Sequence, residues 1–242
     1  GIGIERYLFT VREATAAALP AGSAPLRVLH ISDAHMAPWQ RRKQDWLASL
    51  ADLEPDLIVN TGDNLGHRDG LDGIRRAFEP FAGIPGVFVH GSNDVHGPTP
   101  RNPLRYFAGP SKRHVKPDHL DTAGLDAFLG EELGWADLNN SAARVRVGER
   151  DVDFFGVNDA HRDWDDLDAL PGALAGLGAR DAATPLLGVT HAPYQRVLNA
   201  FTDLGAQAIF GGHTHGGQVC LPFYGTLVAN CDIPLKQAKG LS

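Results

Sequence analysis

Three short apolar runs alternate with amphipathic stretches in the first part of the chain, and this rhythm constrains the fold more than any other feature. The apolar runs predict buried strands at 26–31, 57–60 and 87–90. The stretches between them, 39–53 and 72–81, carry apolar side chains on one face and predict helices. This order predicts an α/β sheet, in which ligand sites lie beyond the carboxyl ends of the strands.

Polar side chains follow each of these runs closely. Asp33 and His35 follow the first run, Asp63 follows the second, and Asn93 follows the third. Each residue has an ordinary explanation when taken alone, because Asp and Asn are common turn residues. His30 lies inside the first predicted strand, so we interpret it as a core histidine rather than a ligand.

The second half of the chain predicts a second sheet with the same feature. A hairpin at 143–147 and 152–157 precedes apolar strands at 186–190 and 208–210. His191 comes directly after the first of these apolar strands. A last hairpin is expected from residues 218–221 and 226–230.

The stretch Gly211-Gly212-His213-Thr214-His215-Gly216-Gly217 follows the strand at 208–210. The first two glycines allow a sharp turn and a close backbone approach. An extended backbone would project His213 and His215 to the same side, as two ligands of one metal site require. The glycines after them are expected to leave the space beside the site free of side chains.

Composition excludes several functional classes. The 242 residues carry a net charge of −7, which argues against a nucleic-acid partner. Only Cys220 and Cys231 are present, so we expect two buried free thiols rather than a disulfide framework. No run approaches a transmembrane length of about 20 apolar residues. The chain begins at Gly1, so a leader or membrane anchor could lie outside it and localisation stays open between cytoplasm and membrane.

Four other segments carry weaker expectations. Residues 6–12 alternate like a strand, residues 163–168 look like a polar helix start, and Pro193 is placed like a first helical residue. Residues 97–119 are rich in proline and basic side chains. This segment is either a solvated loop or a lid that carries positive charge toward an anionic substrate.

The candidate ligands become informative as a set, because five separate strand ends would otherwise carry metal-type side chains by accident. Carboxylate, amide and imidazole ligands together suit divalent Mn, Fe or Zn. Seven ligands are too many for one ion and about right for two ions that share a carboxylate. The set comprises Asp33, His35, Asp63, Asn93, His191, His213 and His215.

The ordered set resembles the calcineurin-like metallophosphoesterases, whose pattern is D-x-H, G-D, G-N-H-[DE], H and G-H-x-H. The longer string from Gly212 to Gln218 is similar to a bacterial, often membrane-associated subgroup. Some members of that subgroup act on phospholipid or nucleotide-diphospho-lipid substrates.

The resemblance implies which residues share each ion. Asp33, His35 and His215 would hold one metal, and Asn93, His191 and His213 the other, with Asp63 bridging the two. The ions would share a hydroxide that attacks phosphorus in line, so no protein nucleophile is required.

The chain departs from the family pattern at Gly91-Ser92-Asn93-Asp94. In one alignment Asn93 is the ligand and Asp94 takes the place of the family histidine, and in the other Ser92 occupies the ligand position. We favour Asn93, because an amide oxygen is the better neutral ligand. The family's leaving-group histidine is then missing, and we consider Asp94, His96 and His161 as substitutes, with His96 preferred.

We expect one domain over 1–242 with a four-layer α/β/β/α sandwich, two mixed sheets face to face and a dinuclear site at the strand ends. Family members usually continue with further strands, whereas this chain ends 27 residues after His215. The expected activity is hydrolysis of a small-molecule or lipid phosphomonoester or phosphodiester, with peripheral membrane association as one option and the oligomeric state left open. Cyclic-nucleotide phosphodiesterase, phosphoprotein phosphatase and a noncatalytic scaffold are the alternatives.

Overall fold

The structure is a computed structural model that describes residues 8–97, 118–215, 219–221, 225–228 and 231–241. Its helices are α2 (Arg41–Ser49), α3 (Leu71–Phe78), α4 (Thr122–Asp126), α5 (Leu170–Gly176) and α6 (Gln195–Asp203). Its strands are β1 (Val28–Ile31), β2 (Leu57–Asn60), β3 (Gly86–Phe88), β4 (Ala136–Asp137), β5 (Ser141–Val147), β6 (Arg150–Gly156), β7 (Leu186–Thr190), β8 (Ala208–Gly211), β9 (Val219–Leu221) and β10 (Gly225–Val228).

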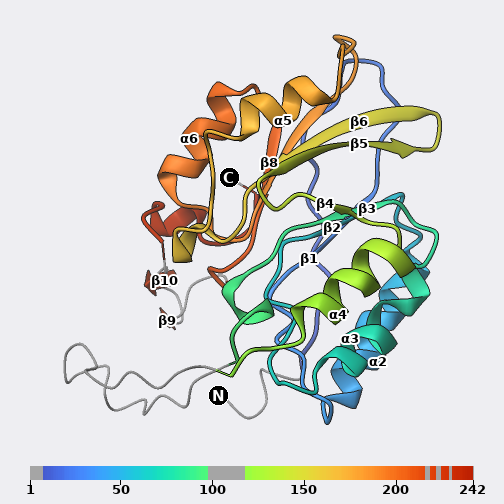
Figure 1. The fold of residues 1–242 in the computed structure, drawn as a ribbon, viewed down its shortest axis with the longest axis vertical. Coiled ribbons are helices and arrows are strands. Elements are labelled where there is room, and N and C mark those ends of the chain that lie inside the picture. The colour runs from blue at the N-terminus through green and yellow to red at the C-terminus, as the bar shows by residue number, and fades with distance from the viewer. Residues whose placement is uncertain (1–7, 98–117, 216–218, 222–224, 229–230, 242) are drawn as a thin grey trace.

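The first sheet has the order β1-β2-β3-β4, and all of its neighbouring strands are parallel. We expected a mixed sheet here, and that detail is wrong. Each connection between neighbouring strands passes through a helix on the same face, as Figure 1 shows for α2, α3 and α4. A helical crossover returns the chain in its original direction, so parallel pairing follows.

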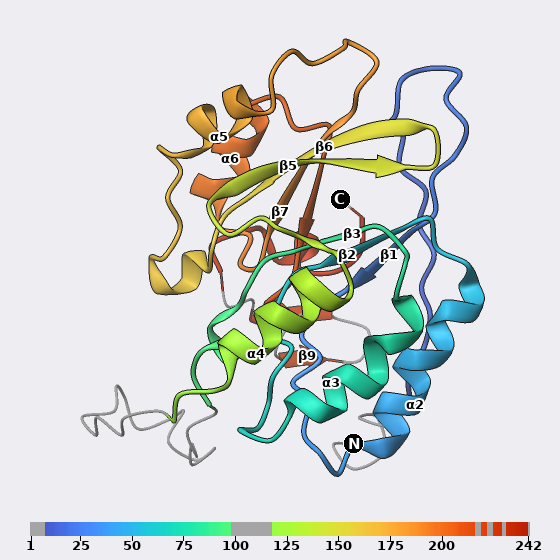
Figure 2. The ribbon, with the colours of Figure 1, turned by 45° about the vertical axis from the view of Figure 1, so that its right-hand side comes forward.

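The second sheet has the order β5-β6-β7-β8. Strands β5 and β6 form the expected antiparallel hairpin, whereas β6, β7 and β8 are parallel. Helices α5 and α6 lie on its outer face, as the turned view in Figure 2 shows. This sheet is mixed, as expected, and β9 and β10 form the expected last hairpin as a separate antiparallel pair.

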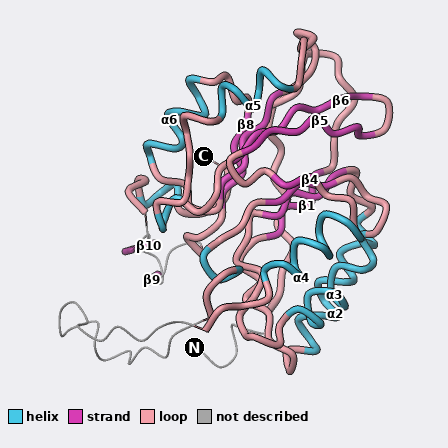
Figure 3. The backbone as a smooth tube through the Cα atoms, viewed as in Figure 1, coloured by secondary structure: helices cyan, strands magenta, loops and turns pink. Residues whose placement is uncertain are grey.

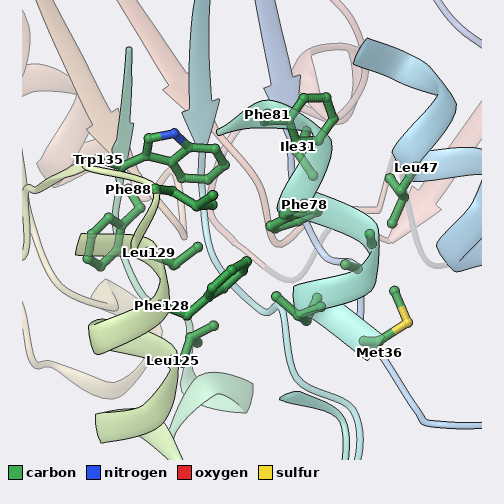
Figure 4. Close-up of a cluster of buried hydrophobic side chains, with 14 of the residues drawn as sticks. Ile31, Met36, Leu47, Phe78, Phe81, Phe88, Leu125, Phe128, Leu129 and Trp135 are labelled. Atoms are coloured by element: carbon green, nitrogen blue, oxygen red, sulfur yellow. The ribbon is translucent and has the colours of Figure 1, made fainter. Parts of the chain in front are cut away.

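Side chains on β2 show how the layers pack. Leu57 and Val59 point between the sheets and pack with Phe154 and Val189 of the second sheet. Ile58 points the other way, into the cluster under the helices that Figure 4 shows. Because successive side chains of a strand alternate between faces, one fully buried strand serves two cores.

Three apolar clusters therefore hold the four layers together. The first lies between α2, α3, α4 and the first sheet, and includes Phe78, Leu129 and Trp135. The second lies between the sheets, and the third lies between the second sheet and helices α5 and α6. Figure 3 shows the two sheets between outer helices. The predicted α/β/β/α sandwich is confirmed.

Three local expectations differ from the structure. Residues 8–12 form no strand and pair with none of the described strands, and Phe9 stacks on Trp46 of α2, while residues 6 and 7 lie outside the described ranges. Residues 163–168 are not a helix start, since Asp163 is left-handed (φ 56°) and α5 begins only at Leu170. Pro193 lies two residues before α6, whose N-cap is Tyr194.

Other expectations fall on residues outside the described ranges. Most of the basic segment 97–119 lies there, as do Gly216 and Gly217. Cys231 is a free, half-buried thiol. Among the described helices, none has the length and apolar character needed to cross a membrane.

Candidate metal centre

The site forms where parallel strands of both sheets end. The loop after β1 lies against the loop after β2, because Asp33 N–H donates to Gly62 O (2.9 Å) and His35 N–H donates to Asp63 O (2.9 Å). In the second sheet, Gly212 N–H donates to His191 O (2.8 Å). Two further bonds join the loops of the two sheets at one edge of the sandwich: His213 N–H donates to Asp33 Oδ2 (2.9 Å), and His191 Nδ1 donates to Thr61 O (2.8 Å).

Asp33, His35 and His215 form the first group of ligand atoms. Nε2 of His215 lies 3.3 Å from Asp33 Oδ1, and Nε2 of His35 lies 3.8 Å from the same oxygen. The two imidazole rings are stacked with centroids 5.2 Å apart, and their Nε2 atoms are 3.4 Å apart. Three ligand atoms thus face one small volume.

Asp63 lies between this group and His191. Its Oδ2 is 3.7 Å from His35 Nε2 and 3.5 Å from His191 Nε2. Asp33, Asp63 and His191 form a second group of atoms close enough to share an ion. The Asp63 side chain is 3% exposed, so its charge must be balanced inside the protein.

His213 and Asn93 lie next to His191 and Asp63 respectively. The His213 ring lies 5.1 Å from the His191 ring and 4.6 Å from the His161 ring. Asn93 donates to Asp63 twice, from its backbone N–H to Oδ1 (2.8 Å) and from Nδ2 to Oδ2 (2.7 Å).

Unpaired ligand atoms test whether this site fits metal ions. Five buried side-chain polar atoms of the described residues have no hydrogen-bond partner, and three belong to candidate ligands. These three are Asp33 Oδ1, His191 Nε2 and His213 Nε2. Buried polar atoms are nearly always paired, and divalent cations at this edge would satisfy all three. The donor set therefore fits the ions that the sequence predicts.

Backbone strain is concentrated at the same residues. Eight described non-glycine residues have positive φ, and five are candidate ligands: Asp33, His35, Asp63, His213 and His215. Such conformations cost about 1–3 kcal/mol each and persist where the surroundings enforce them. The strained residues lie in the loops that carry the candidate ligands.

The left-handed backbone also corrects the expectation for the His-x-His pair. His213 has φ 65° and His215 has φ 51°, so the segment is not extended. The two imidazoles do not face one point, since His215 joins Asp33 and His35 while His213 joins His191 and His161. This division follows the one that the family resemblance implies.

Two glycines are required by close approach. A Cβ on Gly91 would collide with Asp63 Oδ1 and with His191 Cε1 at 2.7 Å. A Cβ on Gly212 would collide with Ser32 Oγ, and would lie 3.0 Å from Asp33 Oδ2. The expected close approach at Gly212 is therefore present.

The pKa values of His191 and His213 are shifted in opposite directions. Burial opposes a charge on His191, but its contact with Asp63 outweighs burial and raises the His191 pKa to about 10. Burial, together with the charges of His191 and His161, lowers the pKa of His213 to about 4. Burial alone would raise the pKa of Asp63. The hydrogen bond from His191 and the charges of His191 and His35 lower it by more, so the pKa lies below its usual value.

The three candidate proton donors lie in different surroundings. Asp94 is fully buried, and its carboxylate accepts hydrogen bonds from backbone N–H groups of the Asp63 loop. His96 packs edge-on against His119 and Trp164, and no contact joins it to a candidate ligand in the described structure. His161 lies beside His213, and its Nδ1 is 2.9 Å from Tyr194 Oη.

His30 and Ser92 are placed as follows. His30 hydrogen-bonds Thr61 Oγ1 (2.9 Å) and packs edge-on against Phe210, so it is a satisfied histidine outside the candidate ligand groups, as expected, although its place on the edge strand β1 leaves it partly open to solvent. Ser92 is buried, and its backbone N–H donates to Asp159 Oδ2 (2.9 Å).

Sequence reasoning assigned no role to Asp159. This fully buried carboxylate accepts from Ser92 N–H in the first sheet's loop and from His161 N–H (2.9 Å) in the second sheet's loop. It thereby fixes His161 relative to the loop that carries Asn93. Its position just past the hairpin strand was the available signal.

A family model described as calcineurin-like phosphoesterase matches residues 26–217. The chain belongs to this family. All seven candidate ligands lie within the matched range, and the family is one of metal-dependent phosphoester hydrolases with a dinuclear metal site.

Individual proteins are more distant. An uncharacterized metallophosphoesterase of Bacillus subtilis strain 168, YkuE, is 25% identical over 244 residues, covering 94% of this chain and 73% of the relative. Solved structures with similar folds include TT1561 of Thermus thermophilus, at 12% identity and a TM-score of 0.45 over 77% of this chain and 81% of that one. Another is phosphopantetheinyl hydrolase (PptH) from Mycobacterium tuberculosis, at 16% identity and a TM-score of 0.44 over 83% and 86%.

The raised pKa of His191 predicts a proton release on metal binding. With a pKa of about 10, the metal-free imidazole is protonated at pH 7.5, and an ion that ligates Nε2 must displace that proton. Titration calorimetry of Mn²⁺ in buffers of different ionisation enthalpy should give about one proton released per chain. Metal binding with no proton release at pH 7.5 would contradict this protonation state.

Proposed function

We propose that the chain hydrolyses a phosphomonoester or phosphodiester of a small molecule or lipid, using two divalent ions held by seven residues. The observation that carries the proposal is the set of unpaired, buried ligand atoms on Asp33, His191 and His213 around Asp63. A protein that kept this fold as a scaffold without metal would gain nothing from leaving such atoms unsatisfied, and activity measurements separate an enzyme from a metal-binding scaffold.

In this proposal Asp33, His35 and His215 hold one ion, and Asn93, His191 and His213 hold the other. Asp63 bridges them, which its distances to His35 and His191 support. Asn93 now faces Asp63 through Nδ2, so ligation through Oδ1 requires the amide to turn over. Mn²⁺ suits this mixture of carboxylate, amide and imidazole, and Fe or Zn are the other candidates.

When bound, two divalent ions would lower the pKa of a water and neutralise phosphoryl oxygens. The chain's own residues set the geometry for this chemistry. His191 Nδ1 donates to Thr61 O (2.8 Å), which leaves Nε2 facing the site. Asp33 Oδ2 accepts from Ser32 Oγ (2.5 Å) and from His213 N–H (2.9 Å), which leaves Oδ1 facing the site.

We assign proton donation to the leaving group to His161 rather than His96 or Asp94. The His161 ring contacts His213, and the Asp159 carboxylate fixes its backbone. Asp94 is enclosed by backbone N–H donors, an arrangement that suits a positioning role. His96 contacts His119 and Trp164 instead of the ligands.

Replacing the bridging carboxylate tests the proposal. Asp63→Ala should lose divalent metal by elemental analysis and lose activity toward a phosphoester panel. The loss should exceed the roughly 10–100-fold that is typical of residues outside the ligand set. Asp69→Ala, which removes an exposed carboxylate from the same loop region, is the matched control and should behave like wild type. Near wild-type turnover by Asp63→Ala would exclude the mechanism.

Leaving-group dependence tests the proton donor. Because p-nitrophenolate leaves readily without a proton, His161→Ala should spare p-nitrophenyl esters and slow alkyl phosphoesters by about 10²-fold. His96→Ala should leave both rates unchanged. If His96→Ala instead slows the alkyl esters alone, His96 is the donor. If His161→Ala slows both kinds of ester equally, His161 helps to position the metal ions rather than to donate a proton.

A further inference from the structure

The loop that carries Asp63 is held by the carboxylate of Asp94. Asp94 Oδ2 accepts from Asp63 N–H (2.8 Å) and from Gly91 N–H (3.1 Å). Its Oδ1 accepts from Asn64 N–H (2.7 Å) and from Leu65 N–H (3.2 Å). One side chain thus fixes three successive residues, including the left-handed backbone of Asp63 (φ 53°).

Asp94 has no exposed surface, so its charge requires a partner inside the protein. His90 supplies one. Its Nδ1 lies 3.5 Å from Asp94 Oδ2, and its Nε2 lies 2.6 Å from Asp126 Oδ1. The contact to Asp94 is an ion pair longer than a hydrogen bond, and His90 Nδ1 has no hydrogen-bond partner among the described residues.

The surroundings of His90 favour a cation. Both ring nitrogens face carboxylates, the side chain is 8% exposed, and its remaining ring neighbour is the apolar Phe88. The backbone N–H is bound to Asn139 Oδ1 (2.9 Å), which fixes the residue further. Burial opposes a charge on His90, but the bonds to Asp126 and Asp94 outweigh it and raise the His90 pKa to about 10.

We infer that the His90 imidazolium, held by Asp126, is a positioning residue that keeps the Asp94 carboxylate aimed at the Asp63 loop. The inference rests on the proposed function for its effect on metal binding. Its structural part, the hold on residues 63–65, does not depend on a metal. The printed contacts of the His90 side chain are to Asp94, Asp126 and Phe88, and none of these is a candidate ligand, so its influence passes through Asp94.

Two variants each disrupt one part of the Asp94–His90–Asp126 contacts. His90→Gln removes the cation beside Asp94, and Asp126→Asn weakens the hold on His90 from the half-exposed side. Phe88→Leu is the matched control, because it disturbs the buried ring beside His90 and leaves all three charged groups in place. The readouts are Mn²⁺ affinity by calorimetry, hydrogen exchange of peptides covering residues 61–66 in metal-free protein, and melting temperature.

We expect His90→Gln to weaken Mn²⁺ binding by about 10–100-fold, the usual loss for a residue that supports a metal ligand from outside. Exchange in peptides 61–66 should accelerate, and Asp126→Asn should show both effects to a smaller degree. Phe88→Leu should lower the melting temperature and leave Mn²⁺ affinity and exchange in that loop unchanged.

Wild-type Mn²⁺ affinity and loop exchange in both charge variants would overturn the inference, as would equal effects in Phe88→Leu. Should His90→Gln fail to fold, Asp126→Asn decides the question through the same readouts. Wild-type protein that binds no Mn²⁺ and cleaves no phosphoester would instead refute the proposed function, and the exchange comparison in metal-free protein would still decide the role of His90.

Discussion

The burial of one carboxylate, that of Asp63, is the constraint on which the site depends. Its Oδ2 lies 3.7 Å from His35 Nε2 and 3.5 Å from His191 Nε2, and Asn93 donates a hydrogen bond to each of the two carboxylate oxygens. A buried charge needs several partners, and those partners come from both sheets of the sandwich. These partners meet at the edge of the two sheets where the candidate metal centre lies. The buried Asp63 carboxylate therefore requires this edge whether or not a metal is bound.

The fold supplies this edge because parallel strands end together. Ile31 of β1 pairs with Asn60 of β2, and Thr190 of β7 pairs with Gly211 of β8, so the following loops leave the sheets at the same level. Backbone strain in those loops then turns the ligand side chains inward. Apolar packing between the sheets provides the stability that such conformations require.

The chain's periodicity was sufficient to predict two sheets and most element positions, since buried strands and one-sided helices leave clear patterns, whereas the four-layer packing was expected only once the family resemblance was added. Periodicity could not predict the parallel first sheet in full, because β4 contains only Ala136 and Asp137 and leaves no pattern. The ligand positions past the strands were visible in the sequence. Which imidazole joins which group was not derivable from spacing, since a left-handed φ at His213 and His215 reverses the expectation for an extended pair.

Residues that position other residues of the site were the hardest to predict from the sequence. Asp159 and His90 are single polar residues near strand ends. Their partners are distant in the sequence, since Asp126 lies 36 positions from His90 and Ser92 lies 67 positions from Asp159, and no local pattern predicts these pairs. Exposure of His30 was also hidden, because an apolar run reads the same on an edge strand as on a central one. Such roles depend on tertiary contacts that local patterns do not encode.

The central claim is that Asp63 bridges two ions, and anomalous diffraction from crystals of manganese-loaded protein tests it most directly. The account predicts two anomalous peaks about 3.5–4 Å apart, with one Asp63 oxygen or the whole carboxylate between them. A single peak, or two peaks of which neither lies at Asp63, would contradict it.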